Sequence, residues 1–130
     1  MGSVYVIAGL LDTAPLLWDL EGDERVPAWL REDIDRDPSR YGVSDVCLWE
    51  VAIKRSVGKL QVIADLPQTL ADLGFARIAI TRSQVWAVGD LPLHHRDPFD
   101  RLLIAQAREL GLPLVTADAA MSAYGVPTLW

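Results

Sequence analysis

The stretch "YGVSDVCLWEVAIKRSVGKL", residues 41–60, changes from the pattern of a β-strand to that of a helix within one residue. Its first four residues, "YGVS", predict a short strand that ends at Ser44. Ser44 is also a favourable N-cap for the amphipathic segment that follows, because its hydroxyl can accept a hydrogen bond from a free N–H of the first helical turn. A strand that leads directly into a helix is the building unit of an α/β domain.

The rest of the chain repeats this unit. Residues 4–11, "VYVIAGLL", are almost all apolar, as expected for a strand that is buried on both faces of a parallel sheet. Further strands are predicted at residues 76–80, 112–118 and 126–130, and further helices at residues 14–20, 27–35, 65–73, 82–88 and 98–110. This alternation predicts an α/β fold, a three-layer α/β/α sandwich with a mainly parallel central sheet. At 130 residues, of which 51% are hydrophobic, the chain should form a single domain, residues 1–130.

The composition argues against several classes of function. No segment approaches the roughly 18 consecutive apolar residues of a membrane span, and no charged-then-apolar leader is seen, so a cytoplasmic protein with no membrane partner is expected. The single cysteine, Cys47, excludes an internal disulfide and a cysteine-based zinc site, and its apolar surroundings predict burial. The net charge of -6 has the wrong sign for non-specific binding of nucleic acid through a broad basic face.

Two aspartates follow predicted strands. Asp12 comes directly after the first strand, and Asp118 follows "LPLVT" by one residue. Both side chains should therefore lie at the carboxyl edge of the sheet, where ligands bind in such folds. Each residue alone can be explained as an N-cap of the next helix. Capping by itself does not require the two side chains to meet.

Glu50 lies beside the predicted apolar face of its helix. That face is predicted to comprise Val46, Trp49, Ile53, Val57 and Leu60. Glu50 is four residues after Val46 and three before Ile53, so it borders the buried side. The alternative is an exposed ion pair with Lys54, which would contribute only a few tenths of a kcal/mol.

Two more acids begin the helix predicted at residues 98–110, in "HRDPFDRLLIAQA". Asp97 suits the N-cap, Pro98 the first helical position and Asp100 the third, where the helix dipole favours a negative charge. Asp100 also shares its face with the apolar residues three, four and seven positions later, so it should point inward. An inward carboxylate is costly unless it is paired or bound to a cation.

These acids can converge on one pocket. Asp12, Glu50, Asp100 and Asp118 would form it, with Asp97 at its rim. Several carboxylates without thiols are typical of a hard-cation site for Mg²⁺ or Mn²⁺. One or two such ions can activate water and stabilise the leaving oxygen of a phosphodiester.

Four segments in this order, "LLDTAPLLW", "SDVCLWEVAIKRSVGKL", "HRDPFDRLLIAQA" and "LVTADAAMSAYGVPTLW", resemble the PIN-domain ribonucleases, specifically VapC-type toxins. The resemblance covers nearly the whole chain. It implies a Mg²⁺- or Mn²⁺-dependent endoribonuclease that cleaves single-stranded or looped RNA, is inhibited by a cognate antitoxin and usually forms a homodimer. By position it makes Asp12, Glu50, Asp100 and Asp118 the four catalytic and metal-binding acids.

The resemblance assigns further residues around the acids. Asp97 matches an extra acid of the "RDPFD" subgroup, and Thr13 and Thr116 match small polar residues beside the site, plausible supports for the metal ligands. Because the net charge is negative, contacts to RNA phosphates must come from local cations. We expect these to be Lys54, Arg96 and Arg101, and we keep the two histidines off the catalytic set.

Five tryptophans are many for this length. Trp49 and Trp86 lie in apolar helical patterns and are expected in the core. Trp18 and Trp29, on the first two predicted helices, could instead form a groove for an antitoxin segment or a second subunit.

Two other functions remain as alternatives. A PIN-like module that has lost catalysis would act only by binding. This alternative stays open because the chain has Ala14 where relatives often have histidine. A signalling receiver domain also combines an α/β fold with Mg²⁺ and a phosphoacceptor aspartate. However, Asp12 lacks an acidic neighbour, and no lysine follows Lys59, so the receiver alternative is the weaker one.

Overall fold

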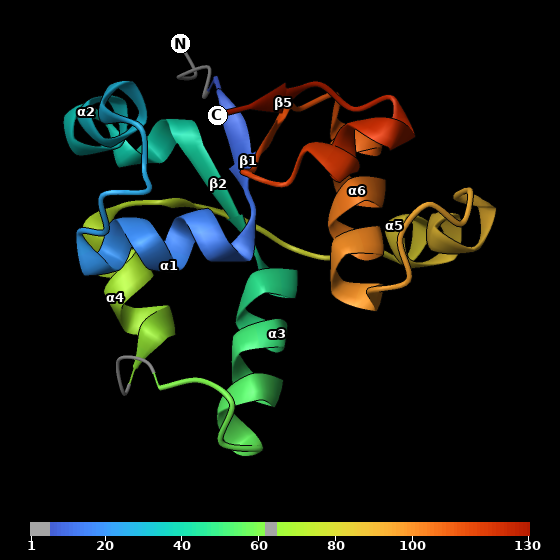
Figure 1. Ribbon diagram of the computed structural model, residues 1–130, viewed down its shortest axis with the longest axis horizontal. Helices are drawn as coiled ribbons and strands as arrows, with labels where there is room; N and C mark the ends of the chain where they lie inside the picture. Colours follow the sequence, from blue (N-terminus) through green and yellow to red (C-terminus); the bar gives the residue numbers. More distant parts are fainter. Residues whose placement is uncertain (1–5, 62–64) are drawn as a thin grey trace, which may run out of the picture.

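A computed structural model describes residues 6–61 and 65–130 of the chain and contains a five-stranded, all-parallel sheet flanked by helices (Figure 1). The strands are β1 (Gly9–Leu11), β2 (Tyr41–Ser44), β3 (Ala76–Ile78), β4 (Leu114–Val115) and β5 (Thr128–Leu129). The α-helices are α1 (Thr13–Glu21), α2 (Ala28–Arg36), α3 (Asp45–Ser56), α4 (Leu66–Leu73), α5 (Arg82–Ala87) and α6 (Pro98–Leu110). Three short 3-10 helices are η1 (Pro38–Arg40), η2 (Val88–Asp90) and η3 (Ala119–Tyr124).

The order of the strands, β3-β2-β1-β4-β5, bears on one of the alternatives. A receiver domain has the order 2-1-3-4-5, in which the first and third strands are neighbours. Here β1 lies in the centre, between β2 and β4. The predicted α/β class with a parallel sheet is therefore confirmed, and the receiver alternative does not fit the topology.

The junction of β2 and α3 forms as predicted. β2 ends at Ser44, and the Ser44 hydroxyl accepts a hydrogen bond from the backbone N–H of Val46, 3.0 Å away. The helix ends at Ser56 instead of continuing to residue 60. Gly58 follows with a φ of 73°, a left-handed conformation that glycine adopts without strain and that stops the helix.

The strands are shorter than predicted. β1 comprises only Gly9–Leu11; Val4 and Tyr5 lie outside the described residues. Gly9 fits a central strand because an added Cβ would lie 2.6 Å from Cγ2 of Val115 on β4. β4 and β5 keep two residues each, and each begins directly after a proline, which cannot donate a ladder hydrogen bond.

Two predictions about the core are wrong. Trp49 and Trp86 are 46% and 84% exposed. The buried residues of α3 are Val46, Cys47, Glu50 and Val51, so the side that packs against the rest of the protein is not the one through Trp49. The α3 sequence carries apolar residues on two sides, and periodicity alone cannot decide which side is buried.

Cys47 is buried as predicted, and burial raises the pKa of its thiol to about 12. Among the residues that the structure describes, no helix has both the length and the hydropathy needed to span a membrane.

Candidate metal centre

Acidic side chains from four parts of the fold lie around the carboxyl ends of β1 and β4. Asp12 follows β1, Glu50 is on α3, Asp100 is on α6, and Asp118 precedes η3. The helices α3 and α6 pack against each other, and in Figure 1 the top of α3 and the lower end of α6 lie near each other, below the end of β1. The topology therefore brings together residues that are far apart in the sequence.

Two of these acids also cap helices. One Asp12 carboxylate oxygen accepts a hydrogen bond from the Thr13 N–H at 2.8 Å, and Asp118 accepts one from the Ala120 N–H at 3.0 Å. Both capping interpretations are thus confirmed. Capping and a shared site are compatible, because each cap occupies one oxygen of its carboxylate.

Two threonines connect the acids to one another. The Thr116 hydroxyl donates to Asp12 Oδ2 at 2.8 Å and accepts from the Asp118 N–H at 3.0 Å. The Thr13 hydroxyl donates to Glu50 Oε1 at 2.7 Å. Since both threonines are buried, these bonds hold the acids in defined orientations.

Glu50 is only 6% exposed, as expected for a residue of the site, and it also forms an ion pair with Lys54. Lys54 Nζ lies 2.6 Å from Glu50 Oε2. This hydrogen bond raises the pKa of Lys54 and places a positive charge beside the buried carboxylate. Lys54, predicted to contact RNA, is therefore engaged with an acid of the site.

Asp97 and Asp100 occupy the predicted positions at the start of α6. Asp97 Oδ1 accepts hydrogen bonds from the N–H groups of Phe99 and Asp100 at 2.8 and 3.0 Å. Burial, together with repulsion from Asp12, Asp97 and Glu50, raises the pKa of Asp100 to about 7. The charges of the other acids thus add to the effect of burial on Asp100.

The pKa of Asp12 is raised as well. Burial is the main cause, and the charges of Glu50 and Asp118 add to it, against hydrogen bonds from Thr116 and Thr13 that lower it. The site therefore contains more negative charge than its own hydrogen bonds stabilise. A bound cation would relieve this excess.

His95 also lies among these acids, which the sequence analysis did not predict. The His95 ring has Nε2 3.2 Å from Asp118 Oδ2 and Nδ1 3.7 Å from Asp100 Oδ2. Ligand atoms of His95, Asp100 and Asp118 all lie within 4.8 Å of one another. The only signal in the sequence was that His95 stands two positions before the helix cap.

Arg101 is the clearest error among the predicted RNA contacts. Its side chain is not free, because the residue is only 8% exposed. The guanidinium donates to the backbone carbonyls of Val88, Leu91, Pro92 and His95 and to the hydroxyl of Tyr124. Arg101 therefore fixes the loop before α6 and is not positioned to bind RNA, whereas Arg96 is exposed.

Arg101→Met should lower the free energy of unfolding by about 2–4 kcal/mol, because four backbone carbonyls would lose the charged donor that the buried guanidinium supplies. Urea unfolding of the purified protein measures this. Arg96→Met is the matched control, with an expected change below about 0.5 kcal/mol. Equal stabilities of the two variants would contradict the structural role of Arg101.

The tryptophans predicted to form a groove differ from each other. Trp18 is partly covered by its own chain: the Arg25 guanidinium lies 4.1 Å from its ring centroid, and Trp130 contacts it edge-on at 5.8 Å. Trp29, on α2, is exposed. Of the two, Trp29 offers the open surface.

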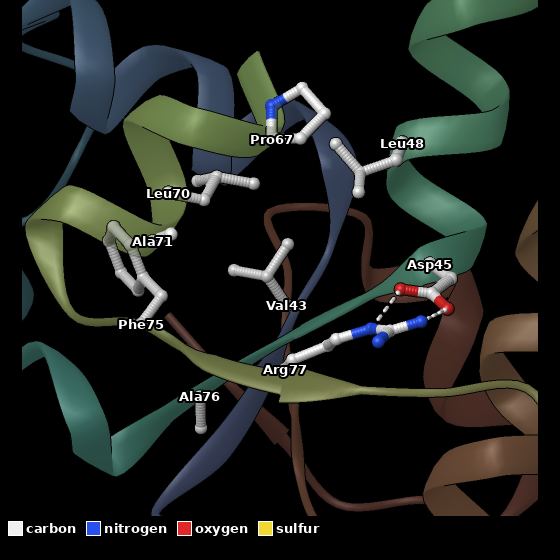
Figure 2. A pocket seen from close by; sticks show the side chains of 9 residues that line it. All are labelled: Val43, Asp45, Leu48, Pro67, Leu70, Ala71, Phe75, Ala76 and Arg77. Atoms are coloured by element: carbon white, nitrogen blue, oxygen red, sulfur yellow. Dashed lines mark hydrogen bonds and ion pairs between the residues drawn. The ribbon is translucent and has the colours of Figure 1, made fainter. Parts of the chain in front are cut away.

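A separate cavity of about 590 Å³ lies between α3, α4 and β3 (Figure 2). Its walls are mainly apolar, with Val43, Leu70 and Phe75 among them, and at its rim Arg77 donates two hydrogen bonds to Asp45, at 3.1 and 2.9 Å. Its described lining includes none of the candidate metal ligands. This cavity suits apolar groups and not the phosphates of a nucleic acid.

Comparisons with known proteins identify the family and the fold. The sequence model of the PIN domain family matches residues 9–127. No curated protein matches the sequence.

Three solved structures share the fold, each with a match that covers nearly all of both chains. DNA-bound VapBC from Salmonella typhimurium matches with a TM-score of 0.68 and 16% identity, over 95% of this chain and 98% of that one. VapBC2 from Rickettsia felis, bound to a DNA fragment from its promoter, matches with a TM-score of 0.65 and 15% identity, over 92% of this chain and 96% of that one. A toxin-antitoxin complex from Klebsiella pneumoniae matches with a TM-score of 0.62 and 20% identity, over 94% of this chain and 96% of that one.

Proposed function

The chain belongs to the PIN domain family, and from this premise we propose that it is a Mg²⁺- or Mn²⁺-dependent endoribonuclease toxin restrained by a cognate antitoxin. The observation that carries the proposal is the group of acids at the carboxyl edge of the sheet. Burial and mutual repulsion raise the pKa values of Asp12 and Asp100 there. Such a group favours a divalent cation, which PIN-type hydrolysis would use.

The donor set fits a hard cation. Carboxylate oxygens are the ligands that Mg²⁺ and Mn²⁺ prefer, and the acids carry an excess of negative charge. Asp12, Asp100 and Asp118 would hold the ion, with Glu50 and Asp97 beside them. When bound, the metal supplies an activated water and stabilises the leaving oxygen of the phosphodiester.

The protein's own residues prepare this site. Thr116 and Thr13 orient the carboxylates of Asp12 and Glu50 by direct hydrogen bonds. Lys54 neutralises part of the Glu50 charge. Arg96 is exposed and follows His95 in the sequence, so we infer that it contacts a substrate phosphate.

The net charge of -6 limits the substrate. Without a broad basic face, binding must depend on contacts close to the scissile bond, so a flexible single strand or loop is a better substrate than a long rigid duplex. Retention of every acid favours catalysis over the alternative of an inactive binding module.

The test is cleavage of fluorescent single-stranded, hairpin and duplex RNA by the purified protein. We expect cleavage of the first two with Mg²⁺ or Mn²⁺ and none with EDTA. Cleavage that persists in EDTA would rule out the metal mechanism. No cleavage of any RNA with either ion would favour the inactive module.

The antitoxin proposal is supported by the toxin-antitoxin complexes among the similar structures. A basic side chain of the partner can enter the acidic site and stand in for the metal, while an apolar helix covers the exposed Trp29. Buried tryptophans commonly contribute strongly to such interfaces.

Trp29→Ala should weaken the complex with the cognate antitoxin by about tenfold, an effect of roughly 1.4 kcal/mol, and leave RNA cleavage unchanged. Calorimetry of the purified partners measures it, with Trp86→Ala as the control for loss of an exposed tryptophan. If the two variants bind equally well, Trp29 is not in the interface.

We also propose a homodimer through α3. Trp49, Ile53 and Val57 are spaced four residues apart and are all exposed, so they form one apolar strip. Phe99 of α6 packs edge-on against Trp49 at 4.6 Å and extends this strip. A second copy related by a two-fold axis would cover the same strip on both chains.

Ile53→Asp should convert this dimer to a monomer, because the two-fold axis brings two buried charges into the interface. Light scattering after gel filtration gives the mass. Leu73→Asp, at an exposed leucine of α4, is the control and should remain dimeric. A wild-type protein that is monomeric at high concentration would refute the dimer.

A further inference from the structure

The His95 side chain lies within the acidic cluster and not on the open surface. Its two ring nitrogens face two different carboxylates, at 3.2 Å from Asp118 and 3.7 Å from Asp100. These two acids belong to separate elements, α6 and the segment before η3. The ring of His95 lies close enough to both for one ion to bind a nitrogen of His95 and an oxygen of each acid. The neighbouring His94 is exposed and packs edge-on against Tyr124 instead.

The backbone of His95 is fixed from two sides. Its N–H donates to the Tyr124 hydroxyl at 2.6 Å, and its carbonyl accepts from the Arg101 guanidinium at 3.3 Å. Tyr124 is on η3 and Arg101 on α6, the same two elements that flank the ring. The fold thus uses buried groups to hold this one loop residue against the acids, which preorganises the side chain.

We propose that His95 is a nitrogen ligand of the metal centre and that it makes the centre prefer Mn²⁺ to Mg²⁺. The inference rests on the proposed function, since it requires that the acids bind a divalent ion. Mg²⁺ strongly prefers oxygen ligands and keeps much of its water, whereas first-row transition ions accept imidazole as well as carboxylate. A mixed set of His95, Asp100 and Asp118 therefore favours the transition ion.

The experiment is direct metal binding by untagged protein, which contains only two histidines, His94 and His95. Calorimetric titration with Mn²⁺ and with Mg²⁺ is done on the wild type, His95→Gln, His94→Gln and Asp100→Asn. We expect the wild type to bind Mn²⁺ at least about tenfold more tightly than Mg²⁺. His95→Gln should weaken Mn²⁺ binding by about tenfold and change Mg²⁺ binding by less than about twofold, as for loss of one ligand of several.

Pulsed electron paramagnetic resonance of bound Mn²⁺ gives a second readout. Nitrogen modulation from a ligating imidazole should be present in the wild type and in His94→Gln and absent from His95→Gln. Circular dichroism melting of each variant verifies the fold, which the backbone contacts of His95 should preserve.

The outcomes separate this inference from the proposed function. If Asp100→Asn loses both ions while His95→Gln binds Mn²⁺ as the wild type does, with the nitrogen signal unchanged, the metal centre stands and the role of His95 is refuted. If the wild type binds neither ion, the metal centre and the role of His95 are both refuted.

Discussion

Asp100→Asn should reduce metal-dependent RNA cleavage by at least about 100-fold. Loss of a group that merely orients a metal ligand costs about 10–100-fold in metal affinity or activity, and loss of a ligand should cost more. Asparagine keeps the shape and size of the side chain and removes its charge, so an intact fold with lost activity would implicate the charge. Initial rates of RNA cleavage at saturating Mn²⁺ and at saturating Mg²⁺ measure the effect.

The control for this variant is Asp90→Asn, which removes an exposed aspartate of η2 outside the acidic cluster. It should cleave at the wild-type rate. Asp12→Asn should behave like Asp100→Asn, since both side chains belong to the same group of partly buried acids. Wild-type rates for both acidic-site variants would refute the assignment of the site.

In the absence of metal, Asp100→Asn should raise the free energy of unfolding at pH 8 by about 2 kcal/mol. The folded state raises the pKa of Asp100 from 3.8 to about 7. Between pH 4 and 7 the native protein therefore binds more protons than the unfolded chain, and its stability falls as the pH rises through this window. Above pH 7 the wild type carries the full cost of an ionised, repelled carboxylate, which asparagine avoids.

The expected size follows from the linkage relation. Raising the pKa of Asp100 from 3.8 to about 7 corresponds to about 4 kcal/mol, and about half of this is expected because the side chain is 21% exposed and its surroundings can relax. This gain in the stability of Asp100→Asn exceeds the loss of the roughly 0.3–1 kcal/mol that a negative charge contributes at a helix N-terminus.

Urea unfolding with EDTA at pH 4 and pH 8 measures this difference. At pH 4 the variant and the wild type should differ little, because Asp100 is then protonated in the folded protein. Saturating Mn²⁺ at pH 8 should reverse the order by stabilising only the wild type. A stability difference that does not change with pH would show that Asp100 is not repelled by its neighbours.

Local features of the sequence determined much of the fold. The N-cap Ser44 and the pattern around it were sufficient to predict β2 and the start of α3. At α6, Asp97, Pro98 and Gly111 marked both ends, and the helix covers the residues predicted. Capping and turn residues act on backbone groups within a few positions of themselves, so their effect can be predicted from the local sequence alone.

The tertiary structure alone decided which surfaces are buried and which residues meet. Trp49 is exposed because the rest of the protein packs against another side of α3, and both sides carry apolar residues. Arg101 and His95 take their places through contacts with Tyr124, 23 and 29 positions away. Thr116 and Asp12 are 104 positions apart. Such contacts depend on how whole elements pack, and no local pattern of residues records that packing.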